Sequence, residues 1–399
     1  MKRKLLLVTF MMLVGSMGIV KADILDGWTK METSVVANPQ NYYFIILHTD
    51  NSLMLGVTKS CSTDADGVAQ NTTSSNYDFI SYQTASEPAQ DLCKVWAIES
   101  CTAEGYTSAY VVRSLANVDC PVNTGSSQWE LKTDGTVHEN SSESAAFNIV
   151  LSDGYWKLQD ATSTTYYWGA WSNAAYVNTE RIAGNAGGNG TTTAGSYNIY
   201  YMSRTNFNQK YQFFGGTDMN HTIVNRGFEY GNATGWTTTY NETFVKNATD
   251  IKGSNDTNVV PQAGSYYVYF WGGGVQQSLK QTVDHLPNGK YSSTIYLCND
   301  VNYEFNGASA GSWGASTPKD EWTLVTVGNQ DVSDGDAVLD IQNWWDGAAD
   351  NANITYVPNT VSDDASAYTL GAATTPLTWY SMVIANAGTY MGHLHNRVD

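Results

Sequence analysis

The stretch Asn225–Thr239, NRGFEYGNATGWTTT, decides the interpretation of the second half of this chain. Glycines, a single carboxylate at Glu229 and the pair Gly235-Trp236 stand among polar residues. This composition is too rich in glycine for a helix and too interrupted for a long strand. Aromatic residues next to turn-forming residues are typical of short β-strands joined by tight turns. The stretch therefore predicts the first strand and turn of an all-β domain, with Phe228 and Trp236 in its core.

Three later segments continue this β pattern. Residues 265–274, SYYVYFWGGG, predict an aromatic strand. Residues 279–298, LKQTVDHLPNGKYSSTIYLC, predict two strands joined as a hairpin at Leu286–Tyr291 by a Pro-Asn-Gly turn. Residues 337–357, AVLDIQNWWDGAADNANITYV, predict two more strands around an Asp-Gly turn. We therefore expect a β-sandwich over residues 221–358.

These blocks resemble the galactose-binding-like jelly roll, a group that includes carbohydrate-binding modules of families 4, 9 and 22. The resemblance rests on N-x-x-F-E-x-G-x-x-x-G-W, on Q-x-x-x-x-L-P-x-G-x-Y and on an Asp-Asn pair before an alternating strand, in that order. One spacing departs from the simplest form, because an extra residue precedes Gly-Trp. The matching residues are Asn225, Phe228, Glu229, Gly235, Trp236, Gln281, Leu286, Pro287, Gly289, Tyr291, Asp350 and Asn351. The resemblance implies a jelly-roll β-sandwich that binds carbohydrate.

The same resemblance implies a structural calcium ion. In such modules the Glu after the Phe joins a carboxylate near the last strand around the ion, which here implicates Glu229 and Asp350. Calcium takes six to eight oxygen ligands and accepts backbone carbonyls, which glycine-containing turns expose. The alternative is that Glu229 caps a turn and that Asp350 begins one.

Three aromatic residues of this module are predicted to contact a sugar: Trp271 before GGG, Tyr303 in VNYEFNG and Trp313 in AGSWGAS. They lie in glycine-flanked loops or at strand ends, where a ring can stay exposed. A flat ring stacks on the apolar side of a pyranose, while Asn, Gln and Asp side chains bond its hydroxyl groups. The alternative is that each ring closes the open end of a small core.

The first half of the chain repeats a strand pattern three times. Each unit opens with an aromatic-x-aliphatic strand and closes with an aromatic-x-Ile strand. The openings lie at Tyr43, Tyr110 and Trp156, and the closings lie at Trp96, Phe147 and Tyr197. Three such units imply a threefold all-β domain. The repeated aromatics Trp96, Phe147, Trp156 and Tyr197 are its expected core.

This arrangement resembles a β-trefoil of the ricin-B lectin type over residues 41–204. Repeats of that type carry Gln-x-Trp at the closing strand. The corresponding positions here are Lys94-x-Trp96, Ala145-x-Phe147 and Gly195-x-Tyr197. Two aromatics in the loop YYWGAWSNAAY, Trp168 and Trp171, are further candidates for stacking on a carbohydrate ligand. The predicted fold class is therefore all-β, a β-trefoil-like domain followed by a β-sandwich jelly roll.

The N-terminus predicts export from a bacterial cell. The basic MKRK, an apolar run over Leu5–Val20 and small residues before Asp23 form a signal peptide of residues 1–22, cleaved after Ala22. No other run is long and apolar enough to predict a membrane span. We therefore expect a secreted protein that is extracellular, periplasmic or held at a cell surface.

The remaining segments are interpreted as connections. Residues 23–40 form a lead, residues 205–220 form a linker, and residues 359–399 form a linker followed by the truncated start of a further β-module. Five cysteines allow at most two disulfides, whose pairing the sequence does not give.

Charge excludes two classes of partner. Removing the four basic residues of the signal peptide from the 20 in the chain leaves 16 against 38 acidic residues, a net charge of −22. Such a surface repels nucleic acid and anionic membranes. A neutral polysaccharide or glycan is the expected partner.

The favoured function is that of a non-catalytic polysaccharide-binding protein or a fragment of a larger modular glycan-degrading protein. No metalloprotease, phosphate-loop or dinucleotide motif is present. The Gly-x-Ser-x-Gly match at Gly307–Gly311 lacks the strand-turn-helix context of a nucleophile. Two alternatives remain. One is a cell-surface adhesion or structural protein with β-modules as spacers, and the other is a glycoside hydrolase whose carboxylate pair the sequence does not reveal.

Overall fold

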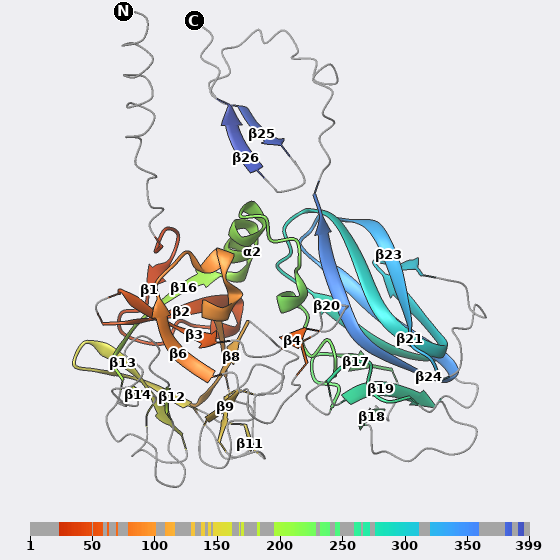
Figure 1. Cartoon of the computed structure of the whole chain (residues 1–399), viewed down its shortest axis with the longest axis horizontal. Helices are drawn as coiled ribbons and strands as arrows, with labels where there is room; N and C mark the ends of the chain where they lie inside the picture. Colours follow the sequence, from red (N-terminus) through yellow and green to blue (C-terminus); the bar gives the residue numbers. More distant parts are fainter. Residues whose placement is uncertain are drawn as a thin grey trace, which may run out of the picture.

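The computed structural model shows two β-rich units with a helix between them (Figure 1). All strand pairs in its described part are antiparallel, which confirms the expected all-β class. No helix in the same part is long and apolar enough to cross a membrane. The structure describes residues 24–49, 51–58, 62–63, 69–70, 79–100, 108–115, 129–131, 137–139, 143–144, 147–161, 167, 169–170, 182–183, 195–228, 232–239, 244–247, 259–264, 266–271, 276–310, 320–358, 380–384 and 390–394.

The second unit is one eight-stranded antiparallel sheet that folds over itself into a sandwich, and its two halves are here called sheet I and sheet II. Its strands are β17 Thr237–Thr238, β18 Phe244–Asn247, β19 Tyr266–Trp271, β20 Gln277–Val283, β21 Gly289–Phe305, β22 Ala308–Ser309, β23 Thr323–Val332 and β24 Ala337–Val357. Sheet I contains β17, β20, the first part of β24, the last part of β21, and β22. Sheet II contains β18, β19, the rest of β24, the start of β21, and β23. Side chains from both sheets fill one core, including Leu279 and Ile341 of sheet I and Val268 and Ile295 of sheet II.

Strand β24 is continuous over 21 residues, so the predicted Asp346-Gly347 turn is wrong. The strand crosses from sheet I to sheet II beside β21, and the register of this pair shifts between Asn299 and Val301. A Cβ atom on Gly347 would lie 2.4 Å from Val301 Cγ2 and 2.8 Å from the Cys298 carbonyl oxygen. The glycine therefore permits the close approach of two strands, which is a different role from turning the chain.

The predicted hairpin at Leu286–Tyr291 is also wrong, because β20 and β21 do not pair. β20 pairs with β17 and β24, whereas β21 pairs with β22, β23 and β24. His285 turns the chain at φ 60°, Leu286 is buried, and its backbone N–H donates to the Gly335 carbonyl at 2.9 Å. The Pro-Asn-Gly segment therefore connects the two sheets across the end of the sandwich.

The described part of the stretch that opens the second unit is a turn that leads into β17, and it forms no strand at Phe228. Phe228 and Trp236 are buried as predicted, with ring centroids 5.4 Å apart. Asn225 has a left-handed φ of 52°, and its Nδ2 donates to the carbonyls of Asn232 and Thr234. Polar bonds to the backbone thus hold the two aromatic rings together.

Gln281 of β20 attaches this turn to sheet I. Its Oε1 accepts from the Val224 backbone N–H at 2.7 Å, and its Nε2 donates to the Val224 carbonyl at 2.8 Å. The side chain is buried, so leaving either backbone group unpaired would cost about 1–3 kcal/mol.

The first unit is built on a closed ring of six strands. Its strands are β1 Thr29–Lys30, β2 Tyr42–His48, β3 Leu53–Thr58, β4 Ser62–Thr63, β5 Ala69–Gln70, β6 Phe79–Thr84, β7 Trp96–Ser100, β8 Tyr110–Ser114, β9 Trp129–Leu131, β10 Val137–Glu139, β11 Glu143–Ser144, β12 Phe147–Ser152, β13 Tyr155–Asp160, β14 Gly169–Ala170, β15 Ile182–Ala183 and β16 Tyr197–Ser203. Short 3-10 turns are η1 Pro39–Asn41, η2 Pro88–Gln90 and η3 Leu92–Lys94. The ring runs β2, β7, β8, β12, β13, β16 and closes because β16 also pairs with β2. Predicted opening and closing strands therefore alternate around it.

The predicted core aromatics of this unit are all buried. Trp96, Phe147 and Tyr197 are fully enclosed, and Trp156 is 3% exposed. Each of these four aromatic residues is the first or second residue of a strand in the closed six-strand ring. The sequence repeat therefore located the core of this unit correctly.

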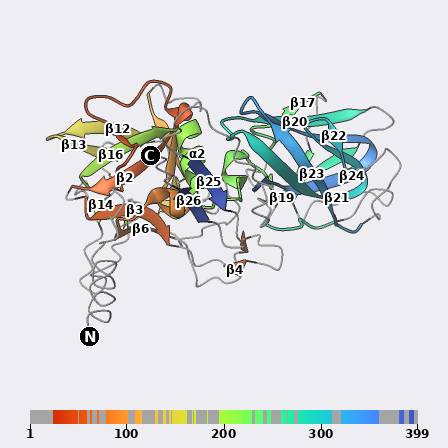
Figure 2. The same cartoon turned by 90° about the horizontal axis from the view of Figure 1, so that it is seen from above.

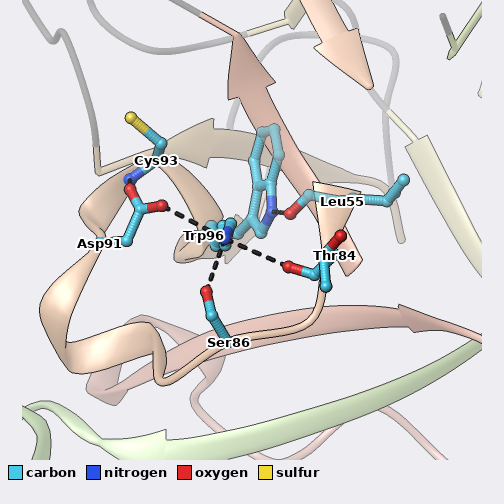
Figure 3. A network of polar contacts seen from close by, with 7 residues as sticks. Leu55, Thr84, Ser86, Asp91, Cys93 and Trp96 are labelled. Carbon is cyan, nitrogen blue, oxygen red and sulfur yellow. Dashed lines mark hydrogen bonds and ion pairs between the residues drawn. The ribbon is translucent and has the colours of Figure 1, made fainter. Parts of the chain in front are cut away.

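Figure 3 shows the polar contacts that close the first repeat. Trp96 Nε1 donates to the Leu55 carbonyl at 3.1 Å. Lys94, at the position where ricin-type repeats carry Gln, is buried. Its Nζ donates to the Thr84 carbonyl at 3.2 Å and lies 3.4 Å from Asp91 Oδ2. These partners compensate the buried ammonium, and they give Lys94 a structural role.

Helix α2, Arg204–Phe213, occupies much of the predicted linker 205–220 and lies between the two units in both views (Figure 2). The Ser203 side chain caps its N-terminus by accepting from the Asn206 backbone N–H. Tyr211 packs against the core clusters of both units. The connection is therefore a packed helix.

His221, in the 3-10 turn η4 Asn220–Thr222, lies at the centre of this junction. Its ring contacts Tyr43 of the first unit and Phe207 and Tyr211 of α2, with centroid separations of 6.0, 6.3 and 5.2 Å. Because these aromatic rings surround it, a charged imidazole at this position would have no contact with water.

Hydrogen bonds determine which ring nitrogen of His221 carries the proton. Asn208 Nδ2 donates to the His285 carbonyl at 2.8 Å, so Asn208 Oδ1 faces His221 and accepts from its Nε2 at 2.9 Å. Burial lowers the pKa of His221 to about 3, and the positive charges of Arg204 and Arg113 add to this effect. The imidazole is therefore neutral near pH 7.

Other sequence expectations fall partly beyond the described ranges. Residues 1–23 are outside them, so the signal peptide and its cleavage stay predictions. Cys93 and Cys298 are thiols, while Cys61, Cys101 and Cys120 are outside the described residues. Near the C-terminus, β25 Tyr380–Ile384 and β26 Tyr390–Leu394 pair as a hairpin, in the region where two strands were expected.

The buried neutral His221 predicts acid destabilisation. Below pH 6.5 the unfolded chain binds a proton at this residue, whereas the folded chain does so only near pH 3. Stability from this group is therefore complete above pH 6.5 and is lost as the pH falls, by about 2 kcal/mol at pH 5. Denaturant unfolding between pH 7 and 5 should show a smaller loss for His221→Gln than for the wild type. His48→Gln is the control, and equal slopes for all three proteins would contradict this account.

The close approach at Gly347 predicts a steric effect. Gly347→Ala should lower the free energy of unfolding by about 1–3 kcal/mol, because the added methyl meets Val301 and a backbone oxygen. Gly328→Ala is the matched control, since its nearest contact would be the Ser292 Oγ at 3.6 Å. Equal melting temperatures for the two variants would show that the strands can move apart at no cost.

Candidate functional site

The side of sheet I that faces away from the core, here called the outer face, carries mostly polar side chains at alternate positions. Leu279 and Ile341 point into the core, so their strand neighbours point outward. The outward positions are Ser278, Lys280 and Thr282 on β20, Val338, Asp340, Gln342 and Trp344 on β24, Asn302 and Glu304 on β21, and Ser309 on β22. Four adjacent strands thus present one continuous, mainly polar face.

Asp340 is the centre of this surface. Its Oδ1 accepts from Ser278 Oγ at 2.6 Å, and its Oδ2 accepts from Gln342 Nε2 at 2.7 Å and lies 3.0 Å from Lys280 Nζ. The carboxylate is only 4% exposed although it lies on the outward side of the strand. Its three partners orient it.

Other polar groups on the outer face have hydrogen-bonding capacity that the described residues do not use. Asn302 Oδ1 accepts from Ser309 Oγ at 2.8 Å, which leaves its Nδ2 directed away from that bond. Asn302 Nδ2, Gln342 Oε1 and the Glu304 carboxylate make no hydrogen bond or ion pair to another residue in the described part of the chain. A donor and two kinds of acceptor therefore lie on neighbouring strands.

Two tryptophans stand at the end of this polar surface. Trp344, the next outward position after Gln342, is 42% exposed, and Trp345 is 54% exposed. They occupy the part of β24 that lies between the two sheets, just before the register places Asp346 opposite Trp271 of β19. Large exposed rings next to fixed polar groups are typical of binding surfaces.

A hollow of about 630 Å³ lies at the other end of the outer face. It is lined by Lys280, Thr282, Glu304, Asn306, Gly307, Asp331, Ser333, Asp334, Asp336, Val338 and Asp340. Five of these side chains are carboxylates and one is an amine, so the hollow is negatively charged. It would repel anionic ligands.

The sequence-predicted sugar contacts fare differently. The prediction that Tyr303 is an exposed sugar-stacking ring is wrong. The side chain is fully buried in the core, and its hydroxyl group bonds Ser293 Oγ. Burial also raises its pKa. Trp313, Trp168 and Trp171 lie outside the described residues, so their roles stay predictions. The backbone of Trp271 ends β19 close in register to the exposed tryptophans, and its role stays a prediction as well.

Of the two predicted calcium ligands, Asp350 lies within the described residues and Glu229 lies outside them. Asp350 is fully buried, and its Oδ2 accepts from the Gln262 backbone N–H at 2.9 Å. The backbone before Glu229 passes nearby, since the Ala352 N–H donates to the Arg226 carbonyl at 3.1 Å. A buried carboxylate beside a backbone turn fits the hard-oxygen chemistry of calcium. No cluster of three or more metal-binding side chains occurs among the described residues.

Sequence reasoning missed the residues that form the outer face. Asp340, Gln342 and Trp344 alternate with apolar residues in AVLDIQNW, and Ser278 and Lys280 do so in QSLKQTV. The period of two is present in the sequence, but the predicted sugar contacts were aromatic rings in glycine-flanked loops. Polar residues at alternate positions of two predicted strands were the available signal.

Comparisons with known proteins give only distant similarity. No family model matches the sequence, and no curated protein matches it. Among solved structures, the chain is similar to TmCBM61 in complex with β-1,4-galactotriose, with 21% identity over 33% of this chain and 96% of that one, and a TM-score of 0.25. It is similar to the CBM22-1 xylan-binding domain from Paenibacillus barcinonensis Xyn10C, with 15% identity over 33% of this chain and 92% of that one, and a TM-score of 0.25. It is also similar to the Clostridium thermocellum Xyn10B CBM22-1-GH10 modules complexed with xylohexaose, with 14% identity over 37% of this chain and 30% of that one, and a TM-score of 0.24. TM-scores this low assign neither a fold nor a function to this chain.

Proposed function

We propose that this chain is a secreted, non-catalytic protein that binds a neutral polysaccharide on the outer face of sheet I. The observation that carries the proposal is the combination of fixed polar groups around Asp340 and Gln342 with the exposed ring of Trp344. Sugars offer hydroxyl groups on their edges and C–H groups on their faces. The outer face offers hydrogen-bonding groups and an aromatic surface side by side.

Preorganisation makes this surface suited to hydrogen-bonding a flexible polymer. Asp340 is held by Ser278, Lys280 and Gln342 before any ligand arrives. The ligand therefore meets acceptors and donors whose rotamers are already fixed, and less conformational entropy is lost on binding. The negative hollow beside them favours a neutral ligand over an acidic one.

The arrangement of Asp340 supports binding more than hydrolysis. A catalytic carboxylate needs an oxygen that can attack or exchange a proton, whereas both oxygens of Asp340 are engaged by neighbouring side chains. Glu304 lies opposite Asp340 in register and is the neighbouring acid on β21. The proposed role of these acids is to orient hydroxyl groups.

The finer assignments are part of the same proposal. A jelly roll of the galactose-binding-like type is supported by the two facing sheets and by the attachment of the opening turn through Gln281. A β-trefoil is supported by the six-stranded ring and by paired strands β3–β6, β9–β10 and β14–β15, one pair between each opening and closing strand. We also propose that the chain is a fragment of a larger modular glycan-degrading protein.

Replacing Trp344 tests polysaccharide binding. In affinity electrophoresis with soluble xylan, β-glucan and mannan, the mature chain should be retarded by at least one polymer. Trp344→Ala should weaken that binding by about tenfold, because the stacking surface is lost. Leu324→Ala, an exposed apolar residue on β23 of sheet II, is the control and should migrate as the wild type does.

Two outcomes would reject this function. Absence of retardation in every gel would remove the ligand class. Retardation that Trp344→Ala leaves unchanged would favour the alternative in which these strands are a structural spacer and another part of the chain makes the contact.

We further propose that Asp350 and Glu229 hold a structural calcium ion. An ion that binds only the folded state at a hundred times its Kd adds about 2.7 kcal/mol of stability, so excess chelator should lower the melting temperature. Added calcium should restore it. Asp350→Asn should melt at a lower temperature and no longer respond to chelator, and an unchanged wild-type midpoint would contradict the ion.

A further inference from the structure

The hollow at the end of the outer face continues toward the helix between the units. A second hollow of about 550 Å³ is lined by Thr205, Gln209 and Gln212 of α2, by the segment His285–Asn288 and by the turn Ser333–Asp336. It shares Ser333, Asp334 and Asp336 with the first hollow. The two hollows therefore adjoin at the turn between β23 and β24, and together they are here called the groove.

One side of the second hollow is a polar face of α2. Thr205, Gln209 and Gln212 are spaced by four and three residues, which places them on one face of a helix. The opposite face carries Phe207 and Tyr211 into the packed junction. Gln209 is exposed and its amide makes no hydrogen bond to the described part of the protein, so it can serve as both donor and acceptor.

The floor of the groove is rigid. The turn Ser333–Asp336 is held by the bond from the Leu286 N–H to the Gly335 carbonyl, and Gly335 has the left-handed φ of 88° that this turn requires. Val332 and Ala337 on either side are buried in the core. Asp334 and Asp336 remain exposed on a fixed support.

We propose that the glycan-binding surface continues through this groove, so that the ligand is an internal stretch of a polysaccharide chain that reaches from Trp344 to α2. This inference rests on the proposed function of the outer face. From Val338 to Trp344 the sheet provides about 20 Å of surface along β24. The turn and the helix extend it, and the connection between the units then becomes part of the binding site.

The two hollows of the groove are lined by the same kinds of polar group. Amides of Gln209 and Asn288, hydroxyls of Thr205 and Ser333 and exposed carboxylates can all bond neutral hydroxyl groups. The second hollow offers no exposed large aromatic ring among its lining residues, so we expect stacking at the Trp344 end and hydrogen bonding at the α2 end. Affinity should therefore grow with chain length.

The test compares a long and a short ligand in variants at the α2 end. Gln209→Arg places a longer, charged side chain in the second hollow, and Gln40→Arg makes the same change on an exposed turn of the first unit. By calorimetry with the polymer retained in the gels and with its trisaccharide, Gln209→Arg should weaken polymer binding by about tenfold and leave trisaccharide binding within about twofold. Gln40→Arg should change neither.

Each result has a distinct meaning. If Trp344→Ala loses binding but Gln209→Arg binds polymer as the wild type does, the extension is wrong and the proposed function stands. Equal loss for polymer and trisaccharide in Gln209→Arg would also overturn the extension. If the wild type binds none of the three polysaccharides, both ideas fall. Gln209→Ala, checked by its melting curve, replaces Gln209→Arg if the arginine prevents folding, and it should give a smaller loss in the same direction.

Discussion

The contact between β21 and β24 at Gly347 is the constraint on which the second unit depends. Because no side chain separates the strands there, both can run from one sheet into the other without a break. One strand then carries Asp340, Gln342 and Trp344 on sheet I and Asp350 in sheet II. The surface proposed to bind sugar and the carboxylate proposed to bind calcium are therefore positioned by the same backbone. Loss of order in one part would be transmitted to the other along a single continuous element.

The outer face of sheet I differs from an ordinary solvated surface in how little freedom its side chains keep. Asp340, Gln342 and Asn302 are buried although they point away from the core. Asp340 bonds Gln342 and Ser278, and Asn302 bonds Ser309, which gives these polar side chains a fixed arrangement. Such a pattern has a cost in desolvation that surface residues ordinarily avoid. Hydrogen bonds to a ligand with complementary hydroxyl groups would offset this desolvation free energy.

Sequence reasoning recovered what depends on local periodicity. The six ring strands of the first unit and the burial of Phe228 and Trp236 follow from alternation and aromatic spacing. It failed where long-range packing decides. Asp346-Gly347 has the letters of a turn, but its glycine is required by a strand distant in sequence, and Pro287-Asn288-Gly289 joins strands that pair with β24 and not with each other. Tyr303 failed for a similar reason, since glycine in the sequence nearby does not reveal which side of a strand faces the core. The outer face could have been found from the period of two in β20 and β24, whereas the groove along α2 could not, because it needs the relative placement of two units.

The junction around His221 limits how this chain can be divided. Helix α2 contributes Phe207 to the core cluster of the first unit, while Asn208 bonds the His285 carbonyl of the second, and Tyr211 packs against both. A boundary drawn within residues 205–220 would cut through these contacts and expose apolar surface on each fragment. The two units therefore cannot be exchanged independently of each other. Recombination that swaps either one would have to carry the helix and its matching partners along with it, which restricts the shuffling by which modular chains acquire new combinations.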